Sequence, residues 1–198
     1  MSLSQSDVDQ LRRAVLASLH EHWRFYLIEG IILIALGAAA IVVPPIATLA
    51  VTIFVGWLFL ISGLVGLYMT YRTRGVPGFW WSLFSAILAV VVGGLLIARP
   101  ISGAFSLTFL LITFFVIEGV VSVMFALDHR RELPGAWGWM LASGIVDLVL
   151  ATIIFAGLPG TAAWAIGLLV GINMTFGGVA LVAMALQARK IDAVSAAI

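Results

Sequence analysis

Two acidic residues stand deep inside long apolar stretches, and these are the side chains of the chain that could do chemistry. Glu118 lies ten residues before Asp128, and Asp147 lies ten residues after Trp137. In a helix that separation is about 15 Å, which is half the thickness of the hydrocarbon core of a bilayer. Because a low-dielectric environment disfavours the charged form of a carboxyl, both acids are expected to be neutral there. The two residues therefore form a candidate proton-binding site.

Two interpretations of Glu118 and Asp147 stay open. If the carboxyls meet, they could share a proton and titrate as a coupled pair, so that the site binds or conducts protons. Alternatively, the protonated acids could hydrogen-bond across helices and act as fasteners between them. Asn173, further along the chain, is a candidate polar partner in either case.

Two more ionisable residues lie closer to the ends of the apolar stretches. Glu29 follows Arg24 by five residues, about 7–8 Å along a helix. It is a candidate proton-binding residue, or a carboxylate that reaches the interface and pairs with an arginine there. Arg99 is a candidate polar partner at the other side, where it snorkels to the surface or attracts an acid.

Catalytic patterns are absent from the sequence. There is no H-E-x-x-H, P-loop or G-x-S-x-G pattern, and the three histidines lie outside the apolar stretches. Cysteine is absent, which excludes disulfides and thiolate chemistry. A formal net charge of +1 gives no electrostatic case for nucleic acid. We therefore expect no enzyme activity, no cofactor, no metal site and no nucleic-acid partner.

The composition identifies the lipid bilayer as the environment of the chain. Hydrophobic residues make up 63% of the sequence and charged residues 10%, against roughly 25% charged in an ordinary soluble domain. A spanning helix needs about 20 mostly apolar residues. Six segments meet that condition: residues 23–43, 46–71, 79–98, 101–127, 137–157 and 161–186. The sequence predicts an all-α protein with six transmembrane helices.

An internal repeat organises these six helices. Pro44, Gly63 and Arg74 each recur 56 residues later, and again after a further 59 residues. Each proline separates two apolar runs, so the repeated unit is predicted to be a two-helix hairpin that turns at the proline. The predicted units are hairpin 1 (23–74), hairpin 2 (75–131) and hairpin 3 (132–190), with a cytoplasmic tail at 191–198.

Basic residues predict the orientation. Nine of the ten lysines and arginines fall on one side of a six-span layout, and Arg99 falls on the other. By the positive-inside rule both termini face the cytoplasm. Residues 1–22 carry apolar side chains at one face of a helical period, which predicts an amphipathic cytoplasmic leader at the membrane surface. No cleavable signal peptide is expected, so the first span would direct the chain to the membrane.

All three hairpins start and end on the same side, so they are parallel repeats. Three copies predict a pseudo-threefold bundle, in which glycine and alanine supply the close helix contacts. The ends of such a repeat array need covering, and a homo-oligomer is one way to cover them.

The repeat pattern resembles the HdeD-type acid-resistance membrane proteins over nearly all of residues 20–190. The likeness lies in the tryptophan at a repeat start, the proline turn and the basic end Tyr71-Arg72-Thr73-Arg74. It is sharpest in Gly135-Ala-Trp137, in the motif from Gly144 to Leu150, and in Leu169-Val-Gly171-Ile172-Asn173. Asp147 matches an acid expected in this motif, whereas Asn173 stands where an acid would also fit.

The resemblance implies a multi-pass protein of the bacterial inner membrane that is linked to survival at low pH, with no catalytic residues to carry over. Three function classes follow from the sequence. Midplane carboxyls could respond to protons, the bundle could stabilise the membrane or a partner, or the protein could be a channel or exporter for protons or a small solute.

Overall fold

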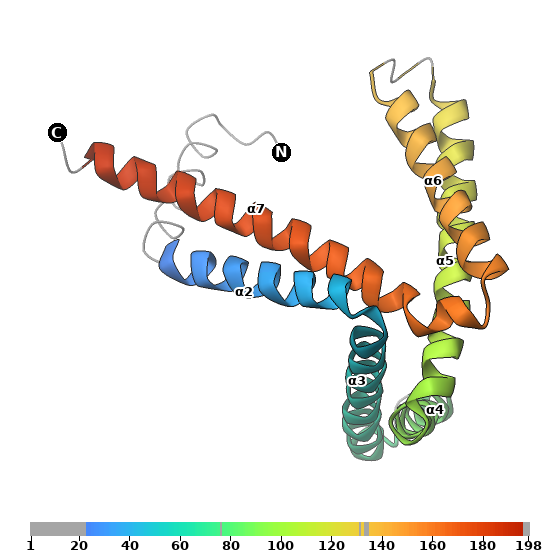
Figure 1. Ribbon diagram of the computed structural model, residues 1–198. Helices are drawn as coiled ribbons and strands as arrows, with labels where there is room; N and C mark the ends of the chain where they lie inside the picture. The colour runs from blue at the N-terminus through green and yellow to red at the C-terminus, as the bar shows by residue number, and fades with distance from the viewer. Residues whose placement is uncertain (1–22, 76, 131, 133–134, 196–198) are drawn as a thin grey trace. The chain divides into compact units, whose positions relative to one another are not determined.

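The computed structural model describes residues 23–75, 77–130, 132 and 135–195, and almost all of them are helical (Figure 1). The elements in chain order are α2 (Trp23–Val42), α3 (Pro44–Arg72), α4 (Phe79–Ala98), α5 (Pro100–Asp128), α6 (Trp137–Ala156), the 3-10 helix η1 (Gly160–Ala163) and α7 (Ala165–Ser195). The predicted leader, residues 1–22, lies outside the described residues. Helix α7 continues into the first five residues of the predicted tail.

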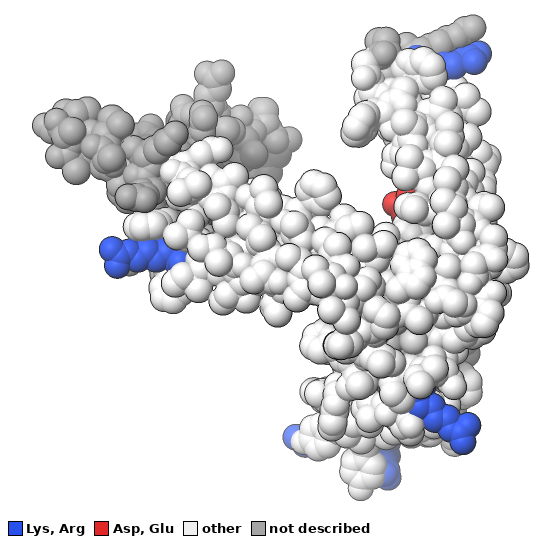
Figure 2. Space-filling view, in the orientation of Figure 1, with Lys and Arg blue, Asp and Glu red and all other residues white. Residues whose placement is uncertain are grey.

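Six of these helices are long and apolar enough to cross a membrane, as the sequence predicts. Their lengths run from 20 residues in α2 to 31 in α7, of which residues 165–187 form the apolar part. Helices rather than strands form because the apolar runs are continuous and rich in leucine and alanine. The chain is a multi-pass membrane protein. Figure 2 shows arginine side chains gathered at helix ends, with an almost uncharged surface along the helices.

The described residues form two compact units. One unit holds α2 and the part of α7 from Leu169 onward, and the other holds residues 43–168. In the first unit, α2 packs antiparallel on α7 through two pairs of glycines. A Cβ added at Gly30 would lie 2.9 Å from the carbonyl oxygen of Gly178, and one at Gly37 would lie 2.7 Å from that of Gly171. Backbone contact this close requires small residues, here glycine, where the two helices meet.

In the unit of residues 43–168, the same kind of contact joins α3 to α4 and α5 to α6. A Cβ added at Gly93 would lie 2.7 Å from the carbonyl oxygen of Gly56. A Cβ added at Gly144 would lie 2.8 Å from the carbonyl oxygen of Gly119. Both pairs run antiparallel and are connected by loops that carry basic residues. We call the second contact the acid seam, because Glu118 and Asp147 adjoin it.

The three glycine contacts occupy equivalent positions of the repeat. Gly30 in α2 corresponds to Ala86 in α4 and Gly144 in α6, at offsets of 56 and 58 residues. Their partners Gly178, Gly63 and Gly119 are equivalent in the same way: a Cβ added at Gly63 would lie 2.9 Å from the carbonyl oxygen of Ala86. The first helix of one repeat thus packs on the second helix of another, and α2 with α7 completes the set.

This pairing corrects one expectation. The sequence predicts that the two helices joined at each proline pack as a tight hairpin. At Pro100 the two helices meet only near the turn, where a Cβ added at Gly103 would lie 2.7 Å from a side-chain carbon of Leu96. The long packing lies instead between α3 and α4 and between α5 and α6, because the glycines face those partners. The pseudo-threefold placement of the pairs stays a prediction.

The third proline turn also differs from its equivalents. Pro44 and Pro100 each occupy the first turn of the helix that follows. After Pro159, by contrast, the chain forms η1 before α7 begins at Ala165. The Thr161 hydroxyl donates a 2.6 Å hydrogen bond to the carbonyl of Ile154, which ties this segment back to α6.

A buried threonine joins α3 to the start of α7. The Oγ1 of Thr48 accepts a 2.9 Å hydrogen bond from the amide of Gly167, and the hydroxyl of Thr52 donates to the carbonyl of Thr48 at 2.8 Å. Thr48 and Thr52 are almost fully buried. The Thr48 hydroxyl therefore satisfies an amide that belongs to the first turn of a helix and has no intrahelical partner.

We expect Thr48→Val to destabilise the protein by about 1–3 kcal/mol, because it leaves the buried amide of Gly167 without an acceptor at unchanged side-chain volume. Reversible unfolding in mixed micelles, followed by circular dichroism, measures the effect. Thr73→Val is the matched control, since the exposed Thr73 hydroxyl bonds only to the carbonyl of Met69 in its own helix. Equal free energies of unfolding for the two variants would contradict the prediction.

Candidate functional site

The structure places Glu118 and Asp147 at the same level of the α5–α6 pair. Glu118 precedes Gly119, and a Cβ added at Gly119 would contact both the carbonyl of Gly144 and the side chain of Leu148. Asp147 precedes Leu148, so each acid adjoins the acid seam. Glu118 is exposed in the single chain, and Asp147 is half-buried. The matching depth expected from the sequence holds in this helix pair.

Neither acid has a polar partner among the described residues: no hydrogen bond or ion pair involves Glu118 or Asp147, and the two side chains do not bond to each other. The other ionisable residue within α5 and α6 is Asp128, at the end of α5. Its neighbour His129 stacks on Phe125 at 4.0 Å between ring centroids. The acid seam therefore holds two carboxyls and no nearby base.

The remaining candidate residues lie elsewhere. Glu29 is exposed on α2 and forms no ion pair within the described part of the chain, so its expected pairing with an arginine is not seen. The guanidinium of Arg24 lies over the ring of Trp23 at 5.4 Å. Asn173 is exposed on α7, in the unit that contains α2. Arg99 is exposed between α4 and α5.

The two acids do not recur at the equivalent positions of the other repeats. The positions equivalent to Glu118 are Ser62 in α3 and Gly177 in α7, and those equivalent to Asp147 are Leu33 in α2 and Ala89 in α4. All three helix pairs nevertheless make the same glycine contact. The packing of a pair therefore does not require an acid at these positions, and the α5–α6 pair is distinguished by carrying an acid at both of them.

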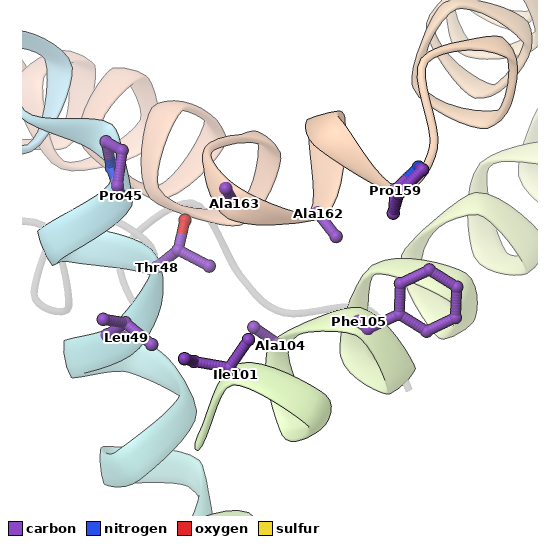
Figure 3. A pocket seen from close by; sticks show the side chains of 9 residues that line it. All are labelled: Pro45, Thr48, Leu49, Ile101, Ala104, Phe105, Pro159, Ala162 and Ala163. Atoms are coloured by element: carbon purple, nitrogen blue, oxygen red, sulfur yellow. The ribbon is translucent and has the colours of Figure 1, made fainter. Parts of the chain in front are cut away.

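Cavities in the unit of residues 43–168 have mainly apolar linings. One of about 340 Å³ lies where α3, α5 and the segment before α7 come together (Figure 3). Thr48, Ala104 and Ala163 line it, each four residues after the proline of its repeat. A second cavity of about 310 Å³ lies further along α3 and α5 and is lined by aliphatic side chains and Phe114. Equivalent positions of three repeats thus surround one cavity.

Sequence reasoning overlooked the polar residues that hold the proline turns together. Thr48 and Thr161 bond to backbone groups at these turns, and a threonine four residues after Pro44 was the available signal. It also overlooked Ser102 and Ser106, which share a cavity with Arg99. Among the described residues, no group of three or more His, Cys, Asp or Glu side chains could hold a metal ion.

Comparison with known proteins gives a matching family model and a set of curated relatives. A family model described as a short repeat of unknown function (DUF308) matches residues 28–98 and again 85–156. The curated relatives include Protein HdeD of Escherichia coli (strain K12), of Escherichia coli O157:H7 and of Shigella flexneri. Each is 26% identical over 173 residues, which cover 86% of this chain and 90% of the relative. No solved structure matches the chain.

Proposed function

The chain belongs to the family of HdeD-like short-repeat (DUF308) membrane proteins, and from that premise we propose that it takes part in resistance to acid stress. We place it in the bacterial inner membrane with both termini in the cytoplasm. The family likeness supports the membrane, and the nine-to-one distribution of basic residues supports the orientation. The role is non-enzymatic, in keeping with a sequence that lacks catalytic motifs.

The acid seam is the part of the molecule that responds to protons. Three helix pairs share one glycine contact, yet Glu118 and Asp147 occur only in the α5–α6 pair. This single observation favours a functional role over a fastening role, because the α3–α4 pair holds together without any acid and the α2–α7 pair without an acid at the equivalent positions. Self-association and the passage of a small solute remain predictions.

Electrostatics determines the direction of the response. When both carboxyls are ionised, two like charges of one seam repel each other, and each also loses solvation in the bilayer. Protonation removes both penalties, and a neutral acid can donate a hydrogen bond across the helices. No base on α5 or α6 lies beside the acids to offset their charge. Acidification therefore tightens the α5–α6 pair, and neutral pH loosens it.

Spin labels test this response directly, because the native chain contains no cysteine. Labels at Leu127→Cys and Gly138→Cys lie at the loop end of the α5–α6 pair. In liposomes we expect the distance between them, measured by electron double resonance, to shorten on acidification. The double variant Glu118→Gln and Asp147→Asn should hold the short distance at either pH, because neither replacement can ionise.

The α3–α4 pair is the matched control. Labels at Tyr71→Cys and Trp80→Cys occupy the corresponding end of a pair that has the glycine contact but no acids. Their distance should not change with pH. A pH-dependent distance in the double variant, or none in the protein with both acids, would refute the proposed role of the acid seam.

In an alternative form of this proposal, Glu118 and Asp147 conduct protons across the membrane. The apolar linings of the cavities near α5 support tightening of the seam rather than conduction. Liposomes that contain a pH-sensitive dye distinguish the two versions. Equal proton leak in empty vesicles and in vesicles with the protein would exclude conduction, whereas a leak abolished by Glu118→Gln and Asp147→Asn would establish it.

A further inference from the structure

A cavity of about 330 Å³ lies between the end of α4 and the start of α5, and its lining combines polar and aliphatic residues. The polar lining residues are Arg99, Ser102 and Ser106. The Ser106 hydroxyl donates to the carbonyl of Ser102 at 3.2 Å, while the guanidinium of Arg99 is exposed and forms no ion pair with a described residue. The aliphatic lining residues are Val92, Leu95 and Leu96, which belong to the last turns of α4.

We propose that this cavity binds one glycerophospholipid, with its phosphate on Arg99 and Ser102 and an acyl chain along Val92, Leu95 and Leu96. An arginine recognises a phosphate through charge and paired hydrogen bonds. The aliphatic residues offer the apolar surface that an acyl chain covers in a membrane. Polar and aliphatic lining residues in one cavity match the two ends of a phospholipid.

The depth of the site agrees with this occupant. Helix α4 contains 20 residues, about 30 Å, which equals the hydrocarbon thickness of a bilayer. Arg99 follows its last residue directly, so the guanidinium lies at the level of the lipid phosphates. The other end of the α3–α4 pair carries Arg72 and Arg74, so Arg99 belongs to the opposite leaflet.

The polar lining residues of this cavity are not required by the repeat. The positions equivalent to Arg99 are Val43 and Leu158, and those equivalent to Ser106 are Ala50 and Ala165. The other two proline turns therefore form without an arginine. Arg99 is therefore not needed to form the turn at Pro100, and its charge is free to bind a phosphate. The proposed lipid binding does not depend on the role of the acid seam.

Native mass spectrometry of the purified protein in detergent micelles tests the site. Dioleoylphosphatidylglycerol carries the phosphate and the acyl chains, dioleoylglycerol carries the chains alone, and glycerol 3-phosphate carries the phosphate alone. We expect one tightly bound phosphatidylglycerol and at least about tenfold weaker binding of either fragment. Binding of dioleoylglycerol or of glycerol 3-phosphate as tight as that of the whole lipid would overturn the proposal.

Two variants assign the binding to Arg99. Arg99→Gln should weaken phosphatidylglycerol binding about tenfold or more, with unfolding unchanged because the side chain is exposed. Arg74→Gln is the matched control: its guanidinium lies over the ring of Tyr71 at 3.7 Å, at the other end of the helix pair. Equal loss of bound lipid in the two variants, or no loss in Arg99→Gln, would also overturn the proposal.

Discussion

Gly144→Ala is expected to cost about 1–3 kcal/mol of stability and to abolish the pH response of the α5–α6 pair. The added Cβ would lie 2.8 Å from the carbonyl oxygen of Gly119, 2.9 Å from a methyl of Val123 and 3.0 Å from the Cβ of Ser122. A backbone oxygen cannot move aside as a flexible side chain can, so the helices must separate. Separation at this level also draws Glu118 and Asp147 apart.

Two measurements check the prediction. Unfolding in mixed micelles gives the stability, and the distance between labels at Leu127→Cys and Gly138→Cys gives the pH response. For the stability measurement, Gly138→Ala on the same helix is the control, because nothing lies within 4 Å of a Cβ there. It should be neutral or stabilising by up to about 1 kcal/mol, as alanine favours helix. Similar losses of stability at Gly138 and Gly144 would show that the close approach is absent.

Gly93→Ala separates stability from function. A Cβ at Gly93 would lie 2.6 Å from the amide nitrogen of Leu60 and 2.7 Å from the carbonyl of Gly56, a contact as close as that in the acid seam. Its neighbour Gly94 has nothing within 4 Å and supplies the control. We expect Gly93→Ala to destabilise the protein as Gly144→Ala does, while the α5–α6 distance still responds to pH. A lost response would indicate general destabilisation instead of a local effect at the acids.

Gly167→Ala is expected to destabilise the protein by about 3 kcal/mol or more. An added Cβ would contact the carbonyl oxygen of Pro44 and would lie 2.8 Å from the amide and 2.9 Å from the Oγ1 of Thr48. The substitution would therefore separate the start of α7 from α3 and break the hydrogen bond from the Gly167 amide.

The same unfolding experiment measures this loss. Gly160→Ala, in the η1 segment that leads to α7, is the control, because nothing lies within 4 Å of a Cβ at that position. Thr48→Val and Gly167→Ala act on one contact, so their effects should not add in the double variant. A loss at Gly167 no larger than that at Gly160 would argue against the junction between α3 and the start of α7.

The acid seam and the lipid cavity each depend on ionisable residues that occur in one repeat and not in the other two. At each site, one repeat has an ionisable side chain at a position where the other two repeats have an apolar or small residue. Glu118 replaces the equivalent of Ser62 and Gly177, and Arg99 replaces the equivalent of Val43 and Leu158. Because the other copies keep the fold without these groups, variants such as Glu118→Gln and Arg99→Gln should change function and leave stability nearly intact.

Sequence alone was sufficient for the membrane, the six helices and the repeat. Apolar runs of about 20 residues have few alternatives in a bilayer, since backbone polar groups must be satisfied within each helix. The proline turns and the depth of Glu118 and Asp147 follow from the same one-dimensional pattern, because distance along a helix is proportional to residue number.

Only the tertiary structure decided which helices pack together. The sequence suggested partners joined at a proline, whereas the long contacts lie between α3 and α4, α5 and α6, and α2 and α7. A glycine in a membrane helix marks a close contact without naming the partner, because every neighbouring helix offers the same apolar surface. The position of Leu148, the residue after Asp147, against Gly119 depends on helix rotation. So does the position of Ser102 and Ser106 around one cavity with Arg99. A hydrophobic pattern on all sides of a helix leaves that rotation undetermined.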